Sequence, residues 1–142
     1  MSSAFIDTSG WASAFDDQQP DHQAAIAAFK QMRKSNFKII TSNYVIAELV
    51  SLFHSPLRIP RPQIFKTIDT IKTYPYLEII YIDPEIDAAA WNLCKARPDK
   101  NWSLVDCTSF VIMQQFDIQQ ALTTDRHFEQ AGFIRLLNSR RN

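Results

Sequence analysis

The sequence predicts an α/β fold: a three-layer α/β/α domain with a central, mainly parallel sheet of about five short strands. Short apolar segments rich in β-branched residues alternate along the chain with longer segments of helical periodicity. The short segments at 3–6 and 120–124 end directly before Asp7 and Asp125, at the edge where open α/β sheets bind ligands. A length of 142 residues suits one domain with a full core, so we expect a single domain over residues 1–142.

In the first half of the chain, polar residues and prolines separate the expected elements. We expect strands at 3–6 and 38–41, and helices at 11–15, 20–35 and 44–54. Residues 8–10 form the turn into the first helix, Pro20 opens the second, and Ser42 or Asn43 caps the third. The connector 55–62 contains three prolines, and a Pro-rich stretch this short stays within a domain.

The second half follows the same alternation. We expect strands at 77–82, 120–124 and 133–137, and helices at 62–73, 83–97, 104–116 and 126–131. Pro62 suits a first helical turn, and residues 77–82 are rich in β-branched and aromatic side chains. Ser103 and Asp106 have the spacing of a capping box, and Gly132 ends the last helix.

The composition indicates a globular protein that does not span a membrane. Hydrophobic residues make up 46% of the chain and glycine occurs only twice, which argues against disorder. No apolar run approaches the roughly 18 residues that a transmembrane helix needs, and the first residues lack the pattern of a signal peptide. We therefore expect a cytoplasmic protein with no membrane partner.

Charge gives no global signature of a nucleic-acid-binding protein, because the net charge is zero. Basic residues nevertheless gather in two runs. These are Lys30, Arg33, Lys34 and Lys38 in the first run and Arg58, Arg61, Lys66 and Lys72 in the second. Each run suits either contact with a phosphate backbone or a solvated helix face.

The two cysteines do not form a metal-binding motif. Cys94 and Cys107 both fall in helical patterns among apolar neighbours, without CxxC spacing and without a nearby histidine. We expect two reduced and buried thiols.

Four acidic residues stand in apolar or small-residue surroundings, where a charge needs an explanation. They are Asp7, Glu48, Asp106 and Asp125. A lone buried carboxylate is costly, whereas several that converge on one divalent cation are stabilised together and can serve phosphodiester chemistry. Asp7 and Asp125 follow strands and Asp106 lies in a first helical turn, so we expect these three and Glu48, from four separated segments, to meet at one edge of the sheet. Taken singly, the same three also suit turns and a helix cap.

Glu48 and His127 need separate consideration. Glu48 lies within a helix on the same side as Tyr44 and Leu52, so we expect its carboxylate to point toward the protein and away from bulk water. His127 follows Asp125 closely enough to be a candidate for contacting a substrate.

The segments that carry the acids resemble the four signature segments of the PIN-domain family, in order and at suitable spacing. They are Asp7-Thr8-Ser9 after a strand, Glu48 in the helix after Thr41-Ser42, Ser103-Leu104-Val105-Asp106, and Thr123-Thr124-Asp125-Arg126-His127-Phe128. The resemblance covers essentially the whole chain. It is strongest to the compact PIN proteins that include the VapC-type toxins of bacterial toxin–antitoxin pairs.

This resemblance implies a metal-dependent endoribonuclease that uses Mg²⁺ or Mn²⁺. The metal-binding and catalytic residues that it implies are Asp7, Glu48, Asp106 and Asp125. The residues whose hydroxyls orient carboxylates or metal-bound waters are Thr8, Ser9 and Thr124. Water is the expected nucleophile, so the product carries a 5′-phosphate. RNA is the expected substrate, and the expected partners are a small antitoxin protein and a second copy of the chain.

Two features depart from the family pattern. Cys107 stands where a small residue, often alanine, tends to follow the third acid, and the net charge is neutral for an RNA enzyme. Two alternatives stay open. A haloacid-dehalogenase-like phosphatase or phosphoacceptor domain shares the strand-end Asp7, but its pattern requires an aspartate where Ser9 stands and leaves Glu48 unexplained. A catalytically idle PIN-like module that binds RNA or protein is the second alternative.

Overall fold

A computed structural model describes residues 2–138 and places a five-stranded sheet at the centre of the molecule. The strands are β1 (Ser3–Ile6), β2 (Lys38–Ser42), β3 (Leu77–Ile80), β4 (Gln120–Leu122) and β5 (Ile134–Arg135). Their order is β3-β2-β1-β4-β5, and every neighbouring pair is parallel. The predicted α/β class is therefore confirmed, with a sheet that is parallel throughout.

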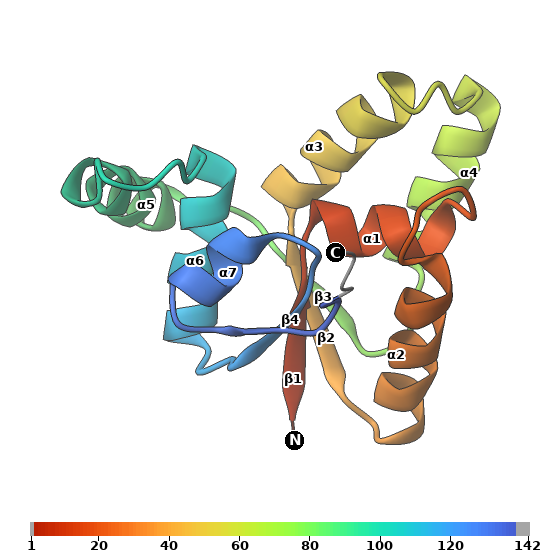
Figure 1. The fold of residues 1–142 in the computed structure, drawn as a ribbon, viewed down its shortest axis with the longest axis horizontal. Coiled ribbons are helices and arrows are strands. Elements are labelled where there is room, and N and C mark those ends of the chain that lie inside the picture. Colours follow the sequence, from red (N-terminus) through yellow and green to blue (C-terminus); the bar gives the residue numbers. More distant parts are fainter. Residues whose placement is uncertain (1, 139–142) are drawn as a thin grey trace.

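Helices cover both faces of the sheet (Figure 1). They are α1 (Thr8–Phe15), α2 (His22–Lys34), α3 (Asn43–His54), α4 (Arg61–Lys72), α5 (Pro84–Ala96), α6 (Leu104–Gln115) and α7 (Arg126–Gln130). The first four helices lie on one side of the strands and α5 to α7 on the other, which gives the three predicted layers. Within residues 2–138, none of the helices is long and apolar enough to cross a membrane.

The predicted elements are all present, but their boundaries differ. The strands predicted at 120–124 and 133–137 are shorter, with β4 ending at Leu122 and β5 spanning Ile134–Arg135. α1 begins at Thr8, three residues earlier than predicted, because the Asp7 carboxylate accepts a hydrogen bond from the backbone N of Gly10 and caps the helix. β3 ends at Ile80 and not at Ile82, since the backbone N of Ile82 donates to the side chain of Asn43 at 2.8 Å.

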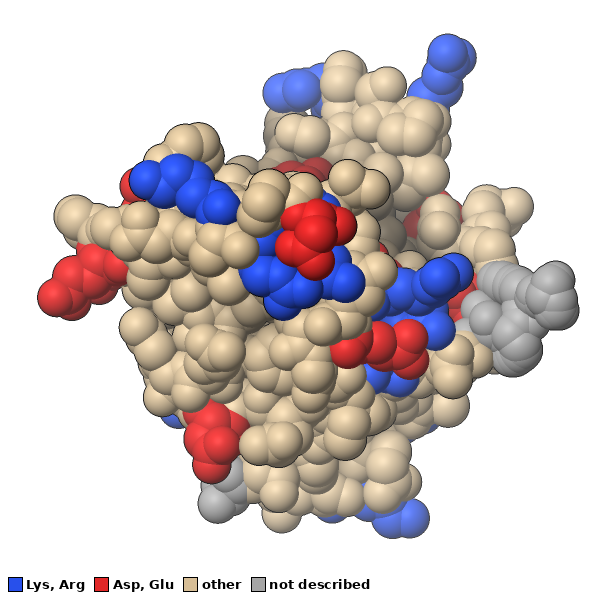
Figure 2. All heavy atoms as spheres, turned by 60° about the vertical axis from the view of Figure 1, so that its left-hand side comes forward, with Lys and Arg blue, Asp and Glu red and all other residues tan. Residues whose placement is uncertain are grey.

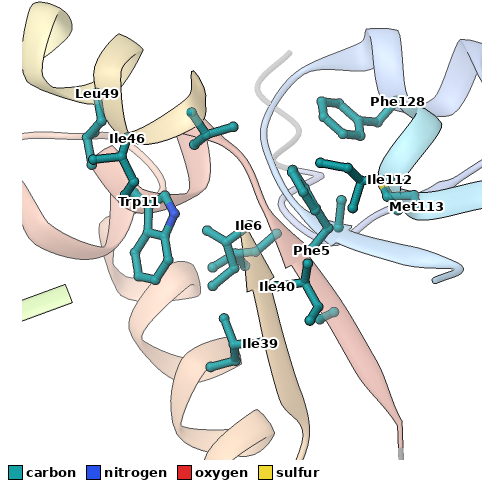
Figure 3. Packing of buried hydrophobic residues seen from close by; sticks show 14 of the residues in the cluster. Phe5, Ile6, Trp11, Ile39, Ile40, Ile46, Leu49, Ile112, Met113 and Phe128 are labelled. Carbon is teal, nitrogen blue, oxygen red and sulfur yellow. The ribbon is translucent and has the colours of Figure 1, made fainter. Parts of the chain in front are cut away.

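The core lies on both faces of the neighbouring strands β1 and β2 (Figure 3). Successive residues of a strand point to opposite faces, so Phe5 packs toward α6 and α7 while Ile6 packs toward α1. Phe5 stacks on Phe128 with ring centroids 6.4 Å apart, and both side chains are fully buried. Trp11 fills the other face, where its indole nitrogen donates to the Thr41 hydroxyl at 3.1 Å.

α1 crosses the end of β4 at very short range. A Cβ atom on Gly10 would lie 2.0 Å from the carbonyl oxygen of Leu122, closer than any side chain permits. The residue before α1 and the residues after β4 are therefore held beside each other, although more than a hundred positions separate them in sequence.

Candidate metal centre

Asp7 lies at the centre of a buried hydrogen-bond network at the carboxyl end of β1. Its side chain is 8% exposed and accepts three hydrogen bonds from the protein. Oδ1 accepts from the Ser9 hydroxyl at 2.8 Å and from the backbone N of Gly10 at 2.9 Å, and Oδ2 accepts from the Thr123 hydroxyl at 2.8 Å. These contacts fix the carboxylate, and Oδ2 keeps one acceptor position free for a further partner.

Thr123 joins the first and fourth acidic segments. Besides donating to Asp7, its hydroxyl accepts from the backbone N of Asp125 at 2.9 Å and lies 3.1 Å from the Ser9 hydroxyl. Ser9 in turn accepts from the backbone N of Thr124 at 2.9 Å. The predicted hydroxyl of Ser9 thus contacts a site carboxylate, whereas Thr124 takes part through its backbone.

Asp106 and Asp125 come together with His127 on the other side of the sheet edge. His127 Nδ1 lies 2.9 Å from Asp106 Oδ2 and 3.3 Å from Asp125 Oδ1. One possible ligand atom from each of the three residues lies within 4.8 Å of the others, a grouping that can hold a metal ion. His127 was predicted only as a candidate for substrate contact, and its closeness to Asp106 follows from the packing of α6 against α7.

Local helix geometry fixes both of these acids. Asp106 completes the predicted capping box: its backbone N donates to the Ser103 hydroxyl at 2.9 Å, and its carboxylate accepts from the backbone N of Ser103 at 3.1 Å. Asp125 caps α7 by accepting from the backbone N of His127 at 2.9 Å. The cap interpretation and the metal interpretation of these residues are therefore compatible, because a capping carboxylate keeps a free acceptor position.

Glu48 differs from its prediction. The residue is exposed to solvent, because the buried side of α3 is formed by Val45, Ile46, Leu49 and Phe53. Its carboxylate accepts a hydrogen bond from the Thr8 hydroxyl, as the predicted orienting role of Thr8 requires. This hydrogen bond connects Glu48 to the segment that carries Asp7. Among the described residues, no hydrogen bond joins Glu48 to Asp7, Asp106 or Asp125.

Burial disfavours the charged forms of two of the site carboxylates. Burial raises the pKa of Asp7 from 3.8 to about 7; hydrogen bonds from Gly10, Thr123 and Ser9 oppose the rise, and the charge of Asp125 adds to it. Burial also raises the pKa of Asp106, against the lowering effect of its hydrogen bond with His127. A bound cation would relieve both effects.

A divalent metal fits this donor set. Carboxylate oxygens are the hard ligands that Mg²⁺ and Mn²⁺ prefer, and Asp106 and Asp125 supply them in the group that also contains His127. Asp7 is not part of that group, but its Oδ2 has a free acceptor position and contacts Thr123, which binds the backbone N of Asp125. The carboxylates are oriented before any metal binds, because Ser9, Thr123 and Ser103 hold them by hydrogen bonds.

Thr123 and Arg135 belong to the site without having been predicted. Arg135 of β5 donates to the backbone carbonyl of Thr124 at 2.9 Å and so supports the segment that leads to Asp125. Two neighbouring threonines precede Asp125 in the sequence, and strand alternation, which turns one of them inward, is the signal that distinguishes Thr123 from Thr124.

Comparison with known proteins finds a matching family and similar proteins. A family model for the PIN domain matches residues 4–134. The 23S rRNA-specific endonuclease VapC20 of Mycobacterium tuberculosis is 27% identical over 131 residues, which span 92% of this chain and 95% of that protein.

Solved structures share the fold. The crystal structure of the Sarcin-Ricin loop cleaving toxin VapC20 of Mycobacterium tuberculosis has a TM-score of 0.79 at 26% identity, covering 93% of this chain and 97% of that one. FitAcB from Neisseria gonorrhoeae has a TM-score of 0.64 at 15% identity, with 93% and 94% covered. PAE2754 from Pyrobaculum aerophilum has a TM-score of 0.64 at 14% identity, with 95% and 90% covered.

Proposed function

Because the chain belongs to the PIN-domain family, we propose that it is a VapC-type endoribonuclease that hydrolyses RNA phosphodiester bonds at the acidic edge of its sheet. The family match and the VapC20 relative confirm the predicted family and an enzyme acting on phosphodiester bonds. The observation that carries the proposal is the grouping of Asp106 and Asp125 with His127, next to the buried Asp7 that Thr123 joins to the Asp125 segment.

We assign the metal to Asp7, Asp106 and Asp125, with Glu48 approaching from α3. A bound Mg²⁺ or Mn²⁺ would supply Lewis-acid activation of water and neutralise charge on the phosphate. The protein's own part is to hold the carboxylates. Thr123 and Ser9 fix Asp7, Ser103 fixes Asp106, and Thr8 orients Glu48.

The phosphatase alternative has no support in the structure. Covalent phosphorylation of Asp7 would require a second aspartate two residues later in the phosphatase pattern. Ser9 stands at that position and donates a hydrogen bond to Asp7 Oδ1.

The RNA target is proposed from the relative. VapC20 is named for cleavage of the Sarcin-Ricin loop of 23S rRNA, so an RNA hairpin with that sequence is the first substrate to test. The face that carries α5 and α6 shows mixed charge and not a continuous basic surface (Figure 2). Two of its basic side chains are paired, Arg97 with Asp99 at 2.9 Å and Arg135 with Glu129 at 3.4 Å. This distribution favours recognition of RNA shape and sequence over strong non-specific binding.

Partner binding is proposed for the exposed apolar side chains of α3 and α4. Val50 is 37% exposed and Phe65 is 52% exposed, and neither is needed to close the core. These positions suit a small antitoxin protein or a second copy of the chain. Sedimentation that finds a monomer at micromolar concentration for both the wild type and Phe65→Ser would count against a homodimer through α4.

The central experiment is cleavage of a pooled, end-labelled RNA and of the loop hairpin with Mn²⁺, Mg²⁺ or EDTA. Wild-type protein should cut with metal and not with EDTA, Asp106→Asn should not cut, and the exposed-carboxylate control Asp69→Asn should cut normally. RNA binding without cleavage under every metal condition would favour the idle binding module instead. Full activity in Asp106→Asn would rule out the proposed metal site.

A further inference from the structure

The two cysteines lie against each other between α5 and α6. Cys94 stands near the end of α5 and Cys107 in the second turn of α6, and their sulfur atoms are 3.1 Å apart. Both are free thiols, and a disulfide would bring the sulfurs to about 2.05 Å. The prediction of two buried thiols is therefore right for Cys107 and wrong for Cys94, which is partly exposed.

This difference in exposure separates the two thiols chemically. Cys107 is completely buried, so a dissolved reagent cannot reach it. Cys94 is reached by solvent, and its thiol points at the backbone carbonyl of Ser103, at 3.9 Å, and at Cys107. A reagent that reacts with Cys94 is thereby placed beside a second, otherwise protected sulfur.

We propose that Cys94 and Cys107 form a reversible disulfide, with a low-molecular-weight disulfide such as oxidised glutathione as the oxidant. The Cys94 thiolate attacks one sulfur of glutathione disulfide, which forms a mixed disulfide and releases one glutathione thiolate. The Cys107 sulfur then attacks the Cys94 sulfur, and the proton of the Cys107 thiol passes to the second glutathione as it leaves. Two cysteine thiols are oxidised, one glutathione disulfide is reduced, and the two protons leave with the two glutathione molecules.

The cross-link would act on the turn that carries Asp106. It closes the chain from Cys94 to Cys107, a loop that contains Trp102 and the capping residue Ser103. Closing a loop restricts the unfolded chain, so the oxidised form should be the more stable one. Exposed disulfides are more easily reduced than buried ones, which suits a reversible cross-link that includes the partly exposed Cys94.

The test uses the full-length protein, folded, with reduced and oxidised glutathione at defined ratios and mass spectrometry of the intact chain. Wild type should lose the mass of two hydrogens and retain no glutathione, and dithiothreitol should reverse the change. Cys107→Ala keeps the buried position apolar and should stop at one retained glutathione on Cys94. Cys94→Ser should remain unmodified.

A second measurement is the thermal midpoint. It should be higher for oxidised than for reduced wild type, and equal for both treatments in Cys94→Ser. A folded wild-type protein that keeps one glutathione, forms intermolecular dimers, or keeps both thiols at the most oxidising ratio would overturn the inference. Because no RNA is involved, these results are independent of the proposed nuclease activity.

Discussion

At the scale of single residues, the site depends on carboxylates that are oriented and charged at a cost to the metal-free protein. Asp7 is the clearest case, since it is buried, receives three hydrogen bonds and still has a pKa raised to about 7. The hydrogen bonds to Asp7 lower its pKa, but by less than burial raises it. A carboxylate in this state is prepared for a cation.

This raised pKa predicts how stability depends on pH. The folded protein holds the Asp7 proton more tightly than the unfolded chain does. The contribution of Asp7 to the free energy of unfolding is therefore fully present below pH 3.8 and is lost as the pH rises through about 7. Asp7→Asn removes this decline and should stabilise the metal-free protein at pH 8 by roughly 1 to 4 kcal/mol, with little gain at pH 4. Thermal melts in EDTA at both pH values measure the difference. A gain of equal size at both would contradict the prediction.

The two neighbouring threonines make a matched pair. Thr123→Val removes the donor to Asp7 and the acceptor for the backbone N of Asp125, so metal affinity should fall about 10- to 100-fold. Thr124→Val should bind metal normally, because Thr124 contributes backbone groups. Titration calorimetry with Mn²⁺ compares the two variants. Equal losses would mean that the Thr124 hydroxyl has the role first expected of it.

At the scale of elements, the contact between α1 and β4 aligns the two halves of the site. Gly10 allows this contact because a side chain at that position would overlap the carbonyl of Leu122. The short approach places Asp7 beside Thr123, and Thr123 in turn positions Asp125. The spacing of the acids is therefore a result of helix–strand packing.

Gly10→Ala should accordingly weaken both the fold and the site. Overpacking costs typically about 1 to 3 kcal/mol, and here the clash is with backbone, so the loss of unfolding free energy should reach or exceed the upper value. The control is Gly132→Ala: its φ of +96° makes the substitution strained, but nothing lies within 4 Å of the added Cβ. Denaturant unfolding and Mn²⁺ affinity together test the prediction. Normal metal binding by folded Gly10→Ala would contradict it.

The elements themselves were predictable because their signals are local. Periodicity and caps within a few residues gave every helix and strand, and the capping box of Ser103 and Asp106 was read from spacing alone. Boundaries failed where a side chain bonded to the backbone, either nearby, as Asp7 does at Gly10, or from a distant segment, as Asn43 does at Ile82. The role of Thr123 depends on a contact across 116 positions, and the exposure of Glu48 depends on which side of α3 packs. The residues next to Thr123 or Glu48 in the sequence therefore do not predict the role of Thr123 or the exposure of Glu48.

At the scale of the whole molecule, charge is separated by the direction of the strands. The acids follow the carboxyl ends of β1 and β4, whereas Lys30, Arg33 and Lys34 lie at the end of α2 that leads into the start of β2. In a parallel sheet the carboxyl ends of the strands and their starts lie at opposite ends of the sheet. The fourth residue of that basic run, Lys38, is paired with Glu78 at 2.6 Å. The first basic run therefore does not face the acidic site.

Metal should stabilise the whole molecule through this acidic edge. Mn²⁺ at 100 times its dissociation constant should add about 2.7 kcal/mol to the free energy of unfolding, because binding favours the folded state. Asp106→Asn should gain much less, and Asp69→Asn should gain as much as wild type. Thermal melts with and without excess Mn²⁺ measure the gain. An equal gain in Asp106→Asn would place the metal elsewhere.

The pairing of β1 with both β2 and β4 also has a consequence for synthesis of the protein on the ribosome. The first strand emerges early, but the Thr123 hydroxyl that holds Asp7 belongs to a segment made near the end of translation. A nascent chain therefore has its first two acids long before it has a site. An RNA-cleaving activity assembled in this way is absent from the growing chain until β4 has emerged and joined the sheet.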